Sequence, residues 1–465
     1  MIDIAVLLQC FCPYPNSTTI SQLSHIILSM LAMTGRVTML GLSRWTGKGG
    51  SYRTVQRFFY TVISWPTLFW VFFHHHCFDP TGVYLLAGDE CVVSKSGKKT
   101  YGLDRFFSSL YGKPIPGLSF FSLSLISVKE RRSYPIRVEQ MIRTEAEKAA
   151  AQANKTSRKT PKGKNEANKE PAPGLIRGKP GRPKGSKNKD KTLLTLSPEL
   201  LRIEAMITEQ LQLIGSVIPL LHMVLDGHFG NYPALHMVRS FGLHLISKLR
   251  HDAALYFPYE GPYAGRGPRR KYGQKIDYDN ILPQYLKQSS VEDDIQTSIY
   301  QAQMLHKEFD QPLNVVIIVK RNIKTHKHAH VVLFSSDLDL SYEHLIDYYR
   351  LRFQIEFNFR DAKQYWGLED FMNVQQTAVS NAANLALFMA NVAHVLMRRF
   401  RIDNPHFGVL DLKAYFRGQK YVVETLKLLP QKPEPVLMAE IFDQISRLGC
   451  VHNTEPYAEP CLVTS

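Results

Sequence analysis

Residues 347–367 read DYYRLRFQIEFNFRDAKQYWG, and this stretch decides how the rest of the chain is interpreted. It lies in a longer run, residues 341–366, whose pattern predicts one continuous helix. Four polar side chains stand at offsets of 0, 3, 7 and 14 residues, namely Tyr349, Arg352, Glu356 and Lys363. At about 100° per residue all four project from a stripe about 60° wide. A solvated helix face with an Arg–Glu pair one turn apart gives the same spacing, so spacing alone leaves that alternative open.

Two further acids stand out by position. Asp89 follows the apolar run VYLLAG, and Asp226 follows PLLHMVL, so each is predicted at the end of a buried strand. A carboxylate is costly there unless it is paired or bound to a metal. A single Asp at a strand end is usually a turn former or a helix cap. Two such acids from two core strands of one α/β domain favour a functional role instead.

The spacing Y-x2-R-x3-E-x6-K, preceded by these two acids, resembles the signature of the IS4-type DDE transposases. The resemblance covers residues 80–370. It implies an α/β fold with an RNase H-like catalytic core, a β-rich insertion between Asp226 and Glu356, an N-terminal helical domain and C-terminal helices. It also implies that Asp89, Asp226 and Glu356 are the catalytic residues.

The same resemblance implies a metal site. Two Mg²⁺ ions, for which Mn²⁺ can substitute, would be held by Asp89, Asp226 and Glu356, with Asp89 bridging both. One ion would activate the attacking oxygen and the other would stabilise the leaving oxygen, and such hard cations prefer carboxylate ligands. Arg352 and Lys363 would contact DNA phosphates, and Tyr349 would position the DNA end. For Arg352, a structural ion pair with Glu356 stays open.

The charge of the chain favours a nucleic-acid partner. The 465 residues carry a formal net charge of +16, and 44% of them are hydrophobic, enough for a packed core. Residues 141–195 hold 15 Lys or Arg against 5 Asp or Glu and lack periodic apolar positions, which predicts a disordered basic insert. Within it, RGKPGRPKGSKNKDK resembles an AT-hook, with Arg182 for the minor groove and Lys184 for phosphate. A solvated linker is the alternative.

Helices are predicted across residues 18–76. SQLSHIILSMLAM and SYRTVQRFFYTVI flank a Gly-broken basic turn, GRVTMLGLSRWTGKGG, and PTLFWVFFHHH follows. This order of a helix, a turn and a second helix that bears Arg53 and Arg57 is consistent with a DNA-binding helix-turn-helix. An ordinary three-helix bundle with surface arginines would look the same.

We therefore expect seven segments. They are residues 1–78, a helical DNA-binding domain; 79–140, the first part of the core; 141–195, the basic insert; 196–251, the second part of the core; 252–340, the β-rich insertion; 341–372, the catalytic helix; and 373–465, a C-terminal helical region. Six cysteines without a CxxC pair, no basic N-terminal region and no apolar run of about 20 residues predict a cytoplasmic, nucleoid-associated protein without disulfides, zinc or a membrane.

These observations predict a DDE transposase of an insertion sequence. It would bind the terminal inverted repeats of its element, cleave DNA with Mg²⁺ and transfer the freed strand to target DNA, as a homodimer on double-stranded DNA. Two alternatives remain open. One is a catalytically silent DNA-binding derivative of a transposase, and the other is an RNase H-like nuclease without strand transfer.

Overall fold

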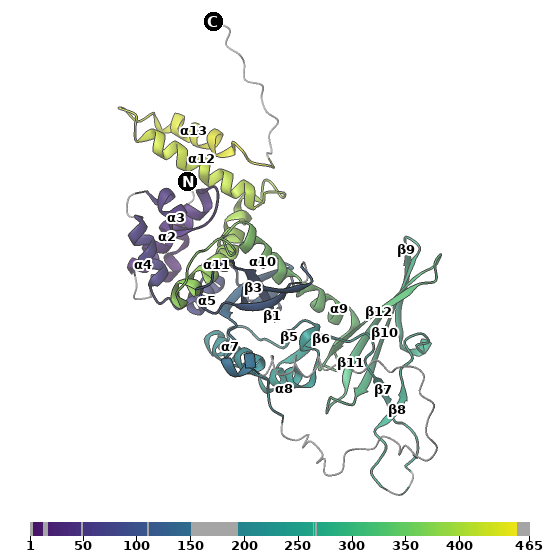
Figure 1. The fold of residues 1–465 in the computed structure, drawn as a ribbon. Coiled ribbons are helices and arrows are strands. Elements are labelled where there is room, and N and C mark those ends of the chain that lie inside the picture. The colour runs from purple at the N-terminus through teal and green to yellow at the C-terminus, as the bar shows by residue number, and fades with distance from the viewer. Residues whose placement is uncertain are drawn as a thin grey trace, which may run out of the picture.

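The computed structural model describes residues 3–12, 17–47, 50–108, 111–149, 194–263, 265 and 267–452 (Figure 1). The helices are α1 (Ile4–Leu7), η1 (Gln9–Phe11), α2 (Ser17–Ala32), α3 (Met39–Thr46), α4 (Tyr52–Tyr60), α5 (Trp65–His76), α7 (Pro198–Ile214), η2 (Gly227–Phe229), α8 (Tyr232–Ser240), η3 (Pro283–Tyr285), α9 (Tyr342–Leu351), α10 (Gln354–Gln364), α11 (Gln376–Phe400), α12 (Val409–Leu426) and α13 (Pro435–Arg447). The strands are β1 (Tyr84–Ser94), β2 (Asp104–Ser108), β3 (Lys113–Ser127), β4 (Arg132–Gln140), β5 (His222–Val224), β6 (His244–Leu249), β7 (Leu255–Pro258), β8 (Tyr272–Lys275), β9 (Leu286–Glu292), β10 (Ile295–His306), β11 (Leu313–Asn322) and β12 (His328–Ser335).

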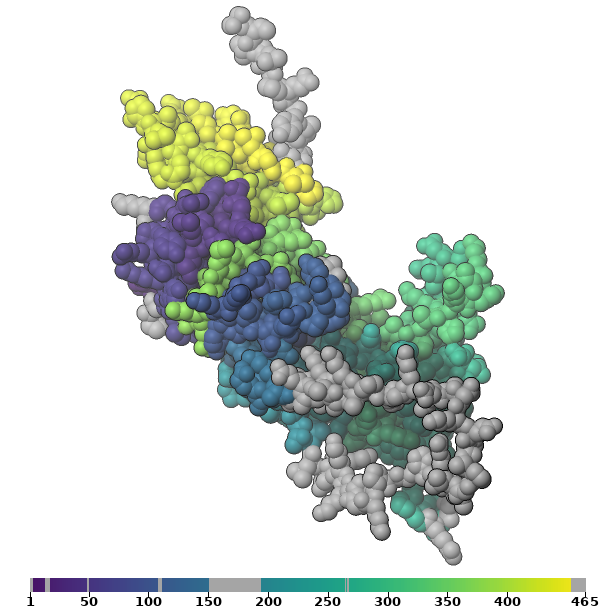
Figure 2. Space-filling view, viewed as in Figure 1, coloured from purple at the N-terminus to yellow at the C-terminus, as the bar shows by residue number. Residues whose placement is uncertain are grey.

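One mixed sheet organises the described part of the chain. Its strand order is β2-β3-β1-β5-β6-β12-β11-β10-β7-β8, with β4 also paired to β3 and β9 to β10. Strand β1 lies between antiparallel β3 and parallel β5, and β5 is parallel to β6. The predicted α/β class is confirmed at this level. The insertion strands extend the same sheet, because β12 pairs antiparallel with β6, and they project to one side of the body (Figure 2).

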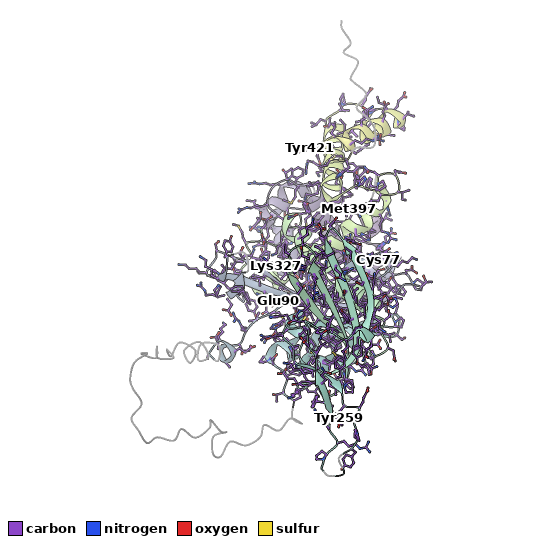
Figure 3. All side chains as sticks on the ribbon, turned by 90° about the vertical axis from the view of Figure 1, so that its right-hand side faces the viewer. Cys77, Glu90, Tyr259, Lys327, Met397 and Tyr421 are labelled. Atoms are coloured by element: carbon purple, nitrogen blue, oxygen red, sulfur yellow. The ribbon has the colours of Figure 1, made fainter. Side chains whose placement is uncertain are left out.

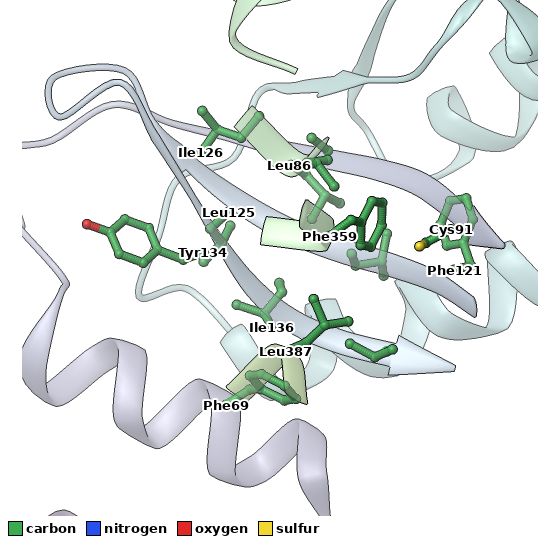
Figure 4. Close-up of a cluster of buried hydrophobic side chains, with 14 of the residues drawn as sticks. Phe69, Leu86, Cys91, Phe121, Leu125, Ile126, Tyr134, Ile136, Phe359 and Leu387 are labelled. Carbon is green, nitrogen blue, oxygen red and sulfur yellow. The ribbon is translucent and has the colours of Figure 1, made fainter. Parts of the chain in front are cut away.

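Helices α5, α10 and α11 pack on the β1–β3–β4 part of the sheet. Figure 4 shows Phe359 of α10 close to Leu86 of β1, and Leu387 of α11 with Phe69 of α5 near Ile136 of β4. Strand β3 is buried from Gly117 to its end. Its side chains along this part must therefore be apolar or form hydrogen bonds. This packing fixes α10 against the strand that carries Asp89.

Helix α11 forms the centre of the helical part of the molecule. Its Phe388 ring meets the rings of Phe11, Trp65, Phe69 and Phe72 at centroid distances of 5.1–6.2 Å. By length and composition α11 is the one helix of the described ranges that could cross a membrane, but 94% of its apolar window is buried inside the protein. Such burial is typical of a core helix.

The N-terminal and C-terminal helices lie together at one end of the molecule. Helix α12 packs on α2 and α13, and Lys413 and Arg417 of α12 donate to the carbonyls of Met30 and Ala32, at 2.7 and 3.1 Å. Figure 3 shows Tyr421 of α12 at this end and Tyr259, just beyond β7, at the opposite end. Helices α2 and α12 therefore pack together, although they are far apart in sequence.

Two local predictions are wrong. The predicted continuous helix of residues 341–366 is two helices, because the amides at the junction bond three residues back: Phe353 to Arg350, Ile355 to Arg352 and Glu356 to Phe353. The predicted basic turn after α2 contains helix α3, whose start is capped by the Thr38 hydroxyl accepting from Gly41 N at 3.0 Å.

Candidate active site

Asp89 and Asp226 come from neighbouring parallel strands. In the β1–β5 ladder Leu86 pairs with Met223 and Ala87 with Val224, so each acid lies two residues beyond the last pair. Neighbouring strands are about 4.8 Å apart. The prediction of a strand end holds for Asp226, which follows β5, but is wrong for Asp89, because β1 continues to Ser94 through its pairing with β3. The topology therefore brings the first two predicted acids together.

The local backbone holds Asp226 in place. Its carboxylate caps η2 by accepting from His228 N at 3.1 Å, and its carbonyl accepts from the Ser247 hydroxyl of β6 at 2.7 Å. Asp226 is thus a helix cap, the ordinary role for an Asp at a strand end. It is nevertheless close enough to Asp89 for its charge to affect that carboxyl group.

Glu356 reaches the same region from the first turn of α10, with Arg352 between the acids. Arg352 Nη1 lies 2.5 Å from Asp89 Oδ2, and Arg352 Nη2 lies 3.6 Å from Glu356 Oε1. The side chains of Asp89 and Arg352 are 17% and 14% exposed, whereas that of Glu356 is 44% exposed. One guanidinium therefore joins an acid of the sheet to an acid of the helix.

The environment of Asp89 disfavours its charge. The pKa of Asp89 is raised to about 6, mainly by burial and also by the carboxylates of Asp226 and Glu356, against the lowering effect of Arg352 and of the Glu90 N–H. Negative charges that lie close together in a partly buried site favour the binding of a cation. In this structure Arg352 supplies that positive charge.

The other two residues of the helix stripe also lie against this edge. Lys363 Nζ donates to the Val92 carbonyl of β1 at 3.0 Å and lies 3.5 Å from Glu369 Oε1. The Tyr349 ring is half-buried beside the Arg352 guanidinium, with 5.9 Å from its centroid to Cζ. Burial raises the pKa of the Tyr349 phenol, and the charges of Asp226 and Asp89 add to the increase. Arg352 and Lys363 thus contact β1, and Tyr349 and Glu356 lie beside Arg352, despite the break in the helix.

The three acids offer the hard oxygen donors that Mg²⁺ or Mn²⁺ takes. Within the ranges that the structure describes, no group of three or more His, Cys, Asp or Glu side chains lies close enough to hold a metal ion. The geometry explains this, because Arg352 separates Asp89 from Glu356. The donor chemistry of the three acids fits a divalent cation.

The remaining predicted DNA contacts lie elsewhere. Arg53 and Arg57 are exposed on α4, and no hydrogen bond or ion pair among the described residues joins them to the three acids. Arg182 and Lys184, with most of the predicted basic insert and its AT-hook-like motif, lie outside the described residues.

Sequence reasoning missed two residues that shape the site. Ser247 is fully buried and holds the Asp226 carbonyl, and a Ser within the apolar stretch HLISKL was the available signal. His228 Nε2 lies 3.3 Å from Glu199 Oε2 of α7, and this contact raises the pKa of His228. The sequence DGH next to a predicted acid gave no sign of Glu199, which is 29 residues away.

The family described as DDE superfamily endonuclease matches residues 7–312 of the chain. That is more than half of its length, and the chain belongs to this family. The match includes Asp89 and Asp226 and ends before the helix that carries Glu356. No curated protein matches the chain. Membership indicates a metal-dependent transposase or nuclease with DNA as its substrate.

Proposed function

We propose that the chain is an IS4-type transposase of an insertion sequence. It binds the terminal inverted repeats of its element, cleaves DNA at their ends and joins the freed 3′-OH to target DNA. The observation that carries the proposal is the convergence of Asp226 and Glu356 on Asp89, with Arg352 between Asp89 and Glu356, within a chain of the DDE endonuclease family. The central place of β1, between an antiparallel hairpin and parallel β5 and β6, supports an RNase H-like core.

Asp89, Asp226 and Glu356 would hold two Mg²⁺ ions, with Mn²⁺ able to substitute. Bound there, the metal supplies an activated attacking oxygen and stabilises the leaving oxygen. The carboxylate of Asp226 is already oriented by the hydrogen bond from His228 N, and Ser247 holds the Asp226 backbone carbonyl. Arg352 leaves Asp89 and Glu356 to donate to a DNA phosphate, because a guanidinium fork matches phosphate oxygens as well as it matches carboxylates.

The rest of the chain supplies DNA contacts in this proposal. Residues 1–78 bind the inverted repeats, with exposed Arg53 and Arg57 of α4 against phosphates. The basic insert, residues 141–195, adds non-specific affinity through Arg182 and Lys184. Tyr349 and Lys363 position the DNA end at the edge of β1. The protein acts as a homodimer that joins two element ends, in the cytoplasm at the nucleoid.

The test is cleavage of a labelled candidate end in Mg²⁺ by the wild type and by Asp89→Ala, Asp226→Ala and Glu356→Ala. We expect each variant to lose at least about 1000-fold in rate, while its affinity for the end DNA largely persists. Asp252→Ala is a matched control, because Asp252 is an exposed acid paired with Arg250 near the same sheet. Undiminished cutting by Asp226→Ala contradicts the proposal, and cutting without joined products points to a nuclease without strand transfer.

A further inference from the structure

A cavity of about 400 Å³ lies between the start of β4, α10, the end of α11 and the start of α12. Arginines dominate its polar lining, with Arg132 from β4, Arg360 from α10 and Arg401 just after α11. Met397 of α11, labelled in Figure 3, closes part of its apolar wall. None of the residues assigned to catalysis or DNA binding above lines it.

The cavity lies mostly on the side of α10 that faces away from the candidate active site. Gln354, Asn358 and Asp361 line the cavity at offsets of 0, 4 and 7 residues, which at about 100° per residue places them within about 60° of one another. By the same arithmetic Glu356 and Lys363 project about 180° away from this stripe, and Phe357 and Arg360, which also line the cavity, fall between the two faces. Helix α10 therefore borders both sites, and Asn358 anchors it by donating to the Ser133 carbonyl at 3.1 Å.

The lining carries an excess of positive charge. Its single carboxylate, Asp361, pairs with the neighbouring Arg360 at 3.0 Å. Arg401 uses its Nε to donate to the Phe407 carbonyl at 2.9 Å, and no carboxylate pairs with it among the described residues. Three guanidinium groups thus face one carboxylate.

Arg132 is the least satisfied of the three. Its Nε is buried and has no hydrogen-bond partner, and among the described residues Arg132 has no ion pair. Burial lowers the pKa of Arg132, and the nearby Arg401 lowers it further, against Tyr134 and Asp361. The acid two residues before it, Glu130, is engaged by Tyr134 and by Arg398 at 3.5 Å.

Ser133 provides a second unsatisfied donor in the same lining, because its hydroxyl is buried without a partner. Buried polar atoms in folded proteins nearly always have a partner, and an unpaired buried charge is strongly destabilising. Two adjacent unsatisfied donors beside a cavity with an excess of positive charge favour an acceptor that carries negative charge.

We propose that this cavity is a binding site for a phosphate group, held by Arg132 and Arg401 with the Ser133 hydroxyl. A guanidinium donates two parallel hydrogen bonds to phosphate oxygens, which suits a tetrahedral anion between two arginines. The phosphate belongs either to a DNA backbone or to a small free phosphate. Either source places a ligand on the back of the helix that presents Glu356.

The test measures binding of inorganic pyrophosphate by calorimetry in metal-free buffer, with wild type, Arg132→Gln, Arg401→Gln and Arg250→Gln. Arg250 is the control because it is exposed and paired with Asp252. We expect each cavity variant to bind at least about 10-fold more weakly, since a charge-assisted hydrogen bond is lost, and the control to bind like the wild type. An Asp226→Ala protein should also bind like the wild type, so the result does not depend on the proposed catalytic site.

A second measurement uses only the wild type, in case a variant fails to fold. An arginine-selective dicarbonyl reagent with peptide mapping should label Arg401 more slowly in the presence of pyrophosphate or of a short DNA duplex. Protection by pyrophosphate alone indicates a free phosphate, and protection by the duplex at far lower concentration indicates the DNA backbone. Absence of protection by both, or equal protection by succinate, overturns the proposal.

Discussion

Arg352 Nη1 lies 2.5 Å from Asp89 Oδ2, across 263 positions of sequence. The same guanidinium reaches Glu356 at 3.6 Å. Because Asp89, Asp226 and Glu356 repel one another, this cation lowers the free energy of the metal-free site. The proposed catalytic cycle therefore begins with an arginine where a metal is needed.

Replacing Arg352 by Gln should separate metal binding from catalysis. Without the competing guanidinium, the affinity of the DNA-free protein for Mg²⁺ or Mn²⁺ should rise by about 5- to 10-fold, which corresponds to about 1–1.4 kcal/mol. Cleavage of end DNA should fall, because a phosphate contact is lost. Calorimetry measures the first effect, with Arg350→Gln on the exposed face of α9 as control. An unchanged metal affinity rules out competition between Arg352 and the metal.

The double variant Arg53→Gln/Arg57→Gln should weaken DNA binding without unfolding the protein. Both arginines are exposed on α4, so two phosphate contacts are lost and the slope of log K against log salt should decrease by about 2. Fluorescence anisotropy with labelled end DNA at several salt concentrations measures the slope. Lys427→Gln, which removes an exposed charge paired with Glu424, is the control. An unchanged slope identifies α4 as an ordinary bundle helix.

Asn381 should be the polar residue on which docking of the N-terminal helices depends most. It accepts from Trp65 Nε1 at 2.7 Å and donates to the carbonyls of Phe59 and Thr61, both at 2.8 Å. Asn381→Ala leaves these groups unpaired in the core, and we expect a loss of about 2–4 kcal/mol in the free energy of unfolding. Urea denaturation followed by tryptophan fluorescence measures it. Exposed Gln376→Ala on the same helix should change stability by less than about 0.5 kcal/mol.

Asp411 makes the C-terminal packing sensitive to acid. Burial acts to raise the pKa of this carboxyl group, but hydrogen bonds from Gly408 N, His452 and Val451 N outweigh it and hold the pKa below its ordinary value. A depressed pKa stabilises the fold above the ordinary value of about 3.9, and that stability is lost as the pH falls through the folded-state pKa.

Amide hydrogen exchange should therefore accelerate at residues 408–412 and 450–452 as the pH is lowered below about 4, after correction for the intrinsic rate. Asp411→Asn should show this faster exchange already at neutral pH. Asp403→Asn, an exposed acid in the preceding loop, should not. Equal protection of these amides in wild type and Asp411→Asn contradicts the assignment.

Some of the site could be predicted from local sequence, and some could not. Asp89 and Asp226 could be identified from the sequence because apolar runs precede them. Such apolar runs are typical of parallel strands, and β1 and β5 do pair in parallel. The break at Arg352 and Phe353 was not visible, because neither residue is Gly or Pro and both keep helical backbone angles. It depends on hydrogen bonding at the junction.

Pairings between residues far apart in the chain could not be predicted from the sequence either. The extension of the core sheet by β12 depends on its register with β6, from Val332 opposite Leu249 to Ser335 opposite Ile246, which no local pattern encodes. The salt bridge between Arg352 and Asp89 is of the same kind, since the spacing of the helix stripe indicated a pair between Arg352 and Glu356 but gave no sign of the contact with Asp89. Helix α3 was missed because glycines at positions 35, 41 and 47 suggested a turn, although Thr38 supplies a cap.

The most direct measurement is the anomalous scattering of Mn²⁺ in crystals of the protein with a DNA end. We predict a peak with oxygens of Asp89 and Asp226 within about 2.5 Å, Glu356 on the same cluster, and the Arg352 guanidinium moved from the carboxylates to a phosphate. A peak remote from these acids, or Arg352 still bound to Asp89 with no metal beside it in a crystal that cleaves its DNA, would contradict the account.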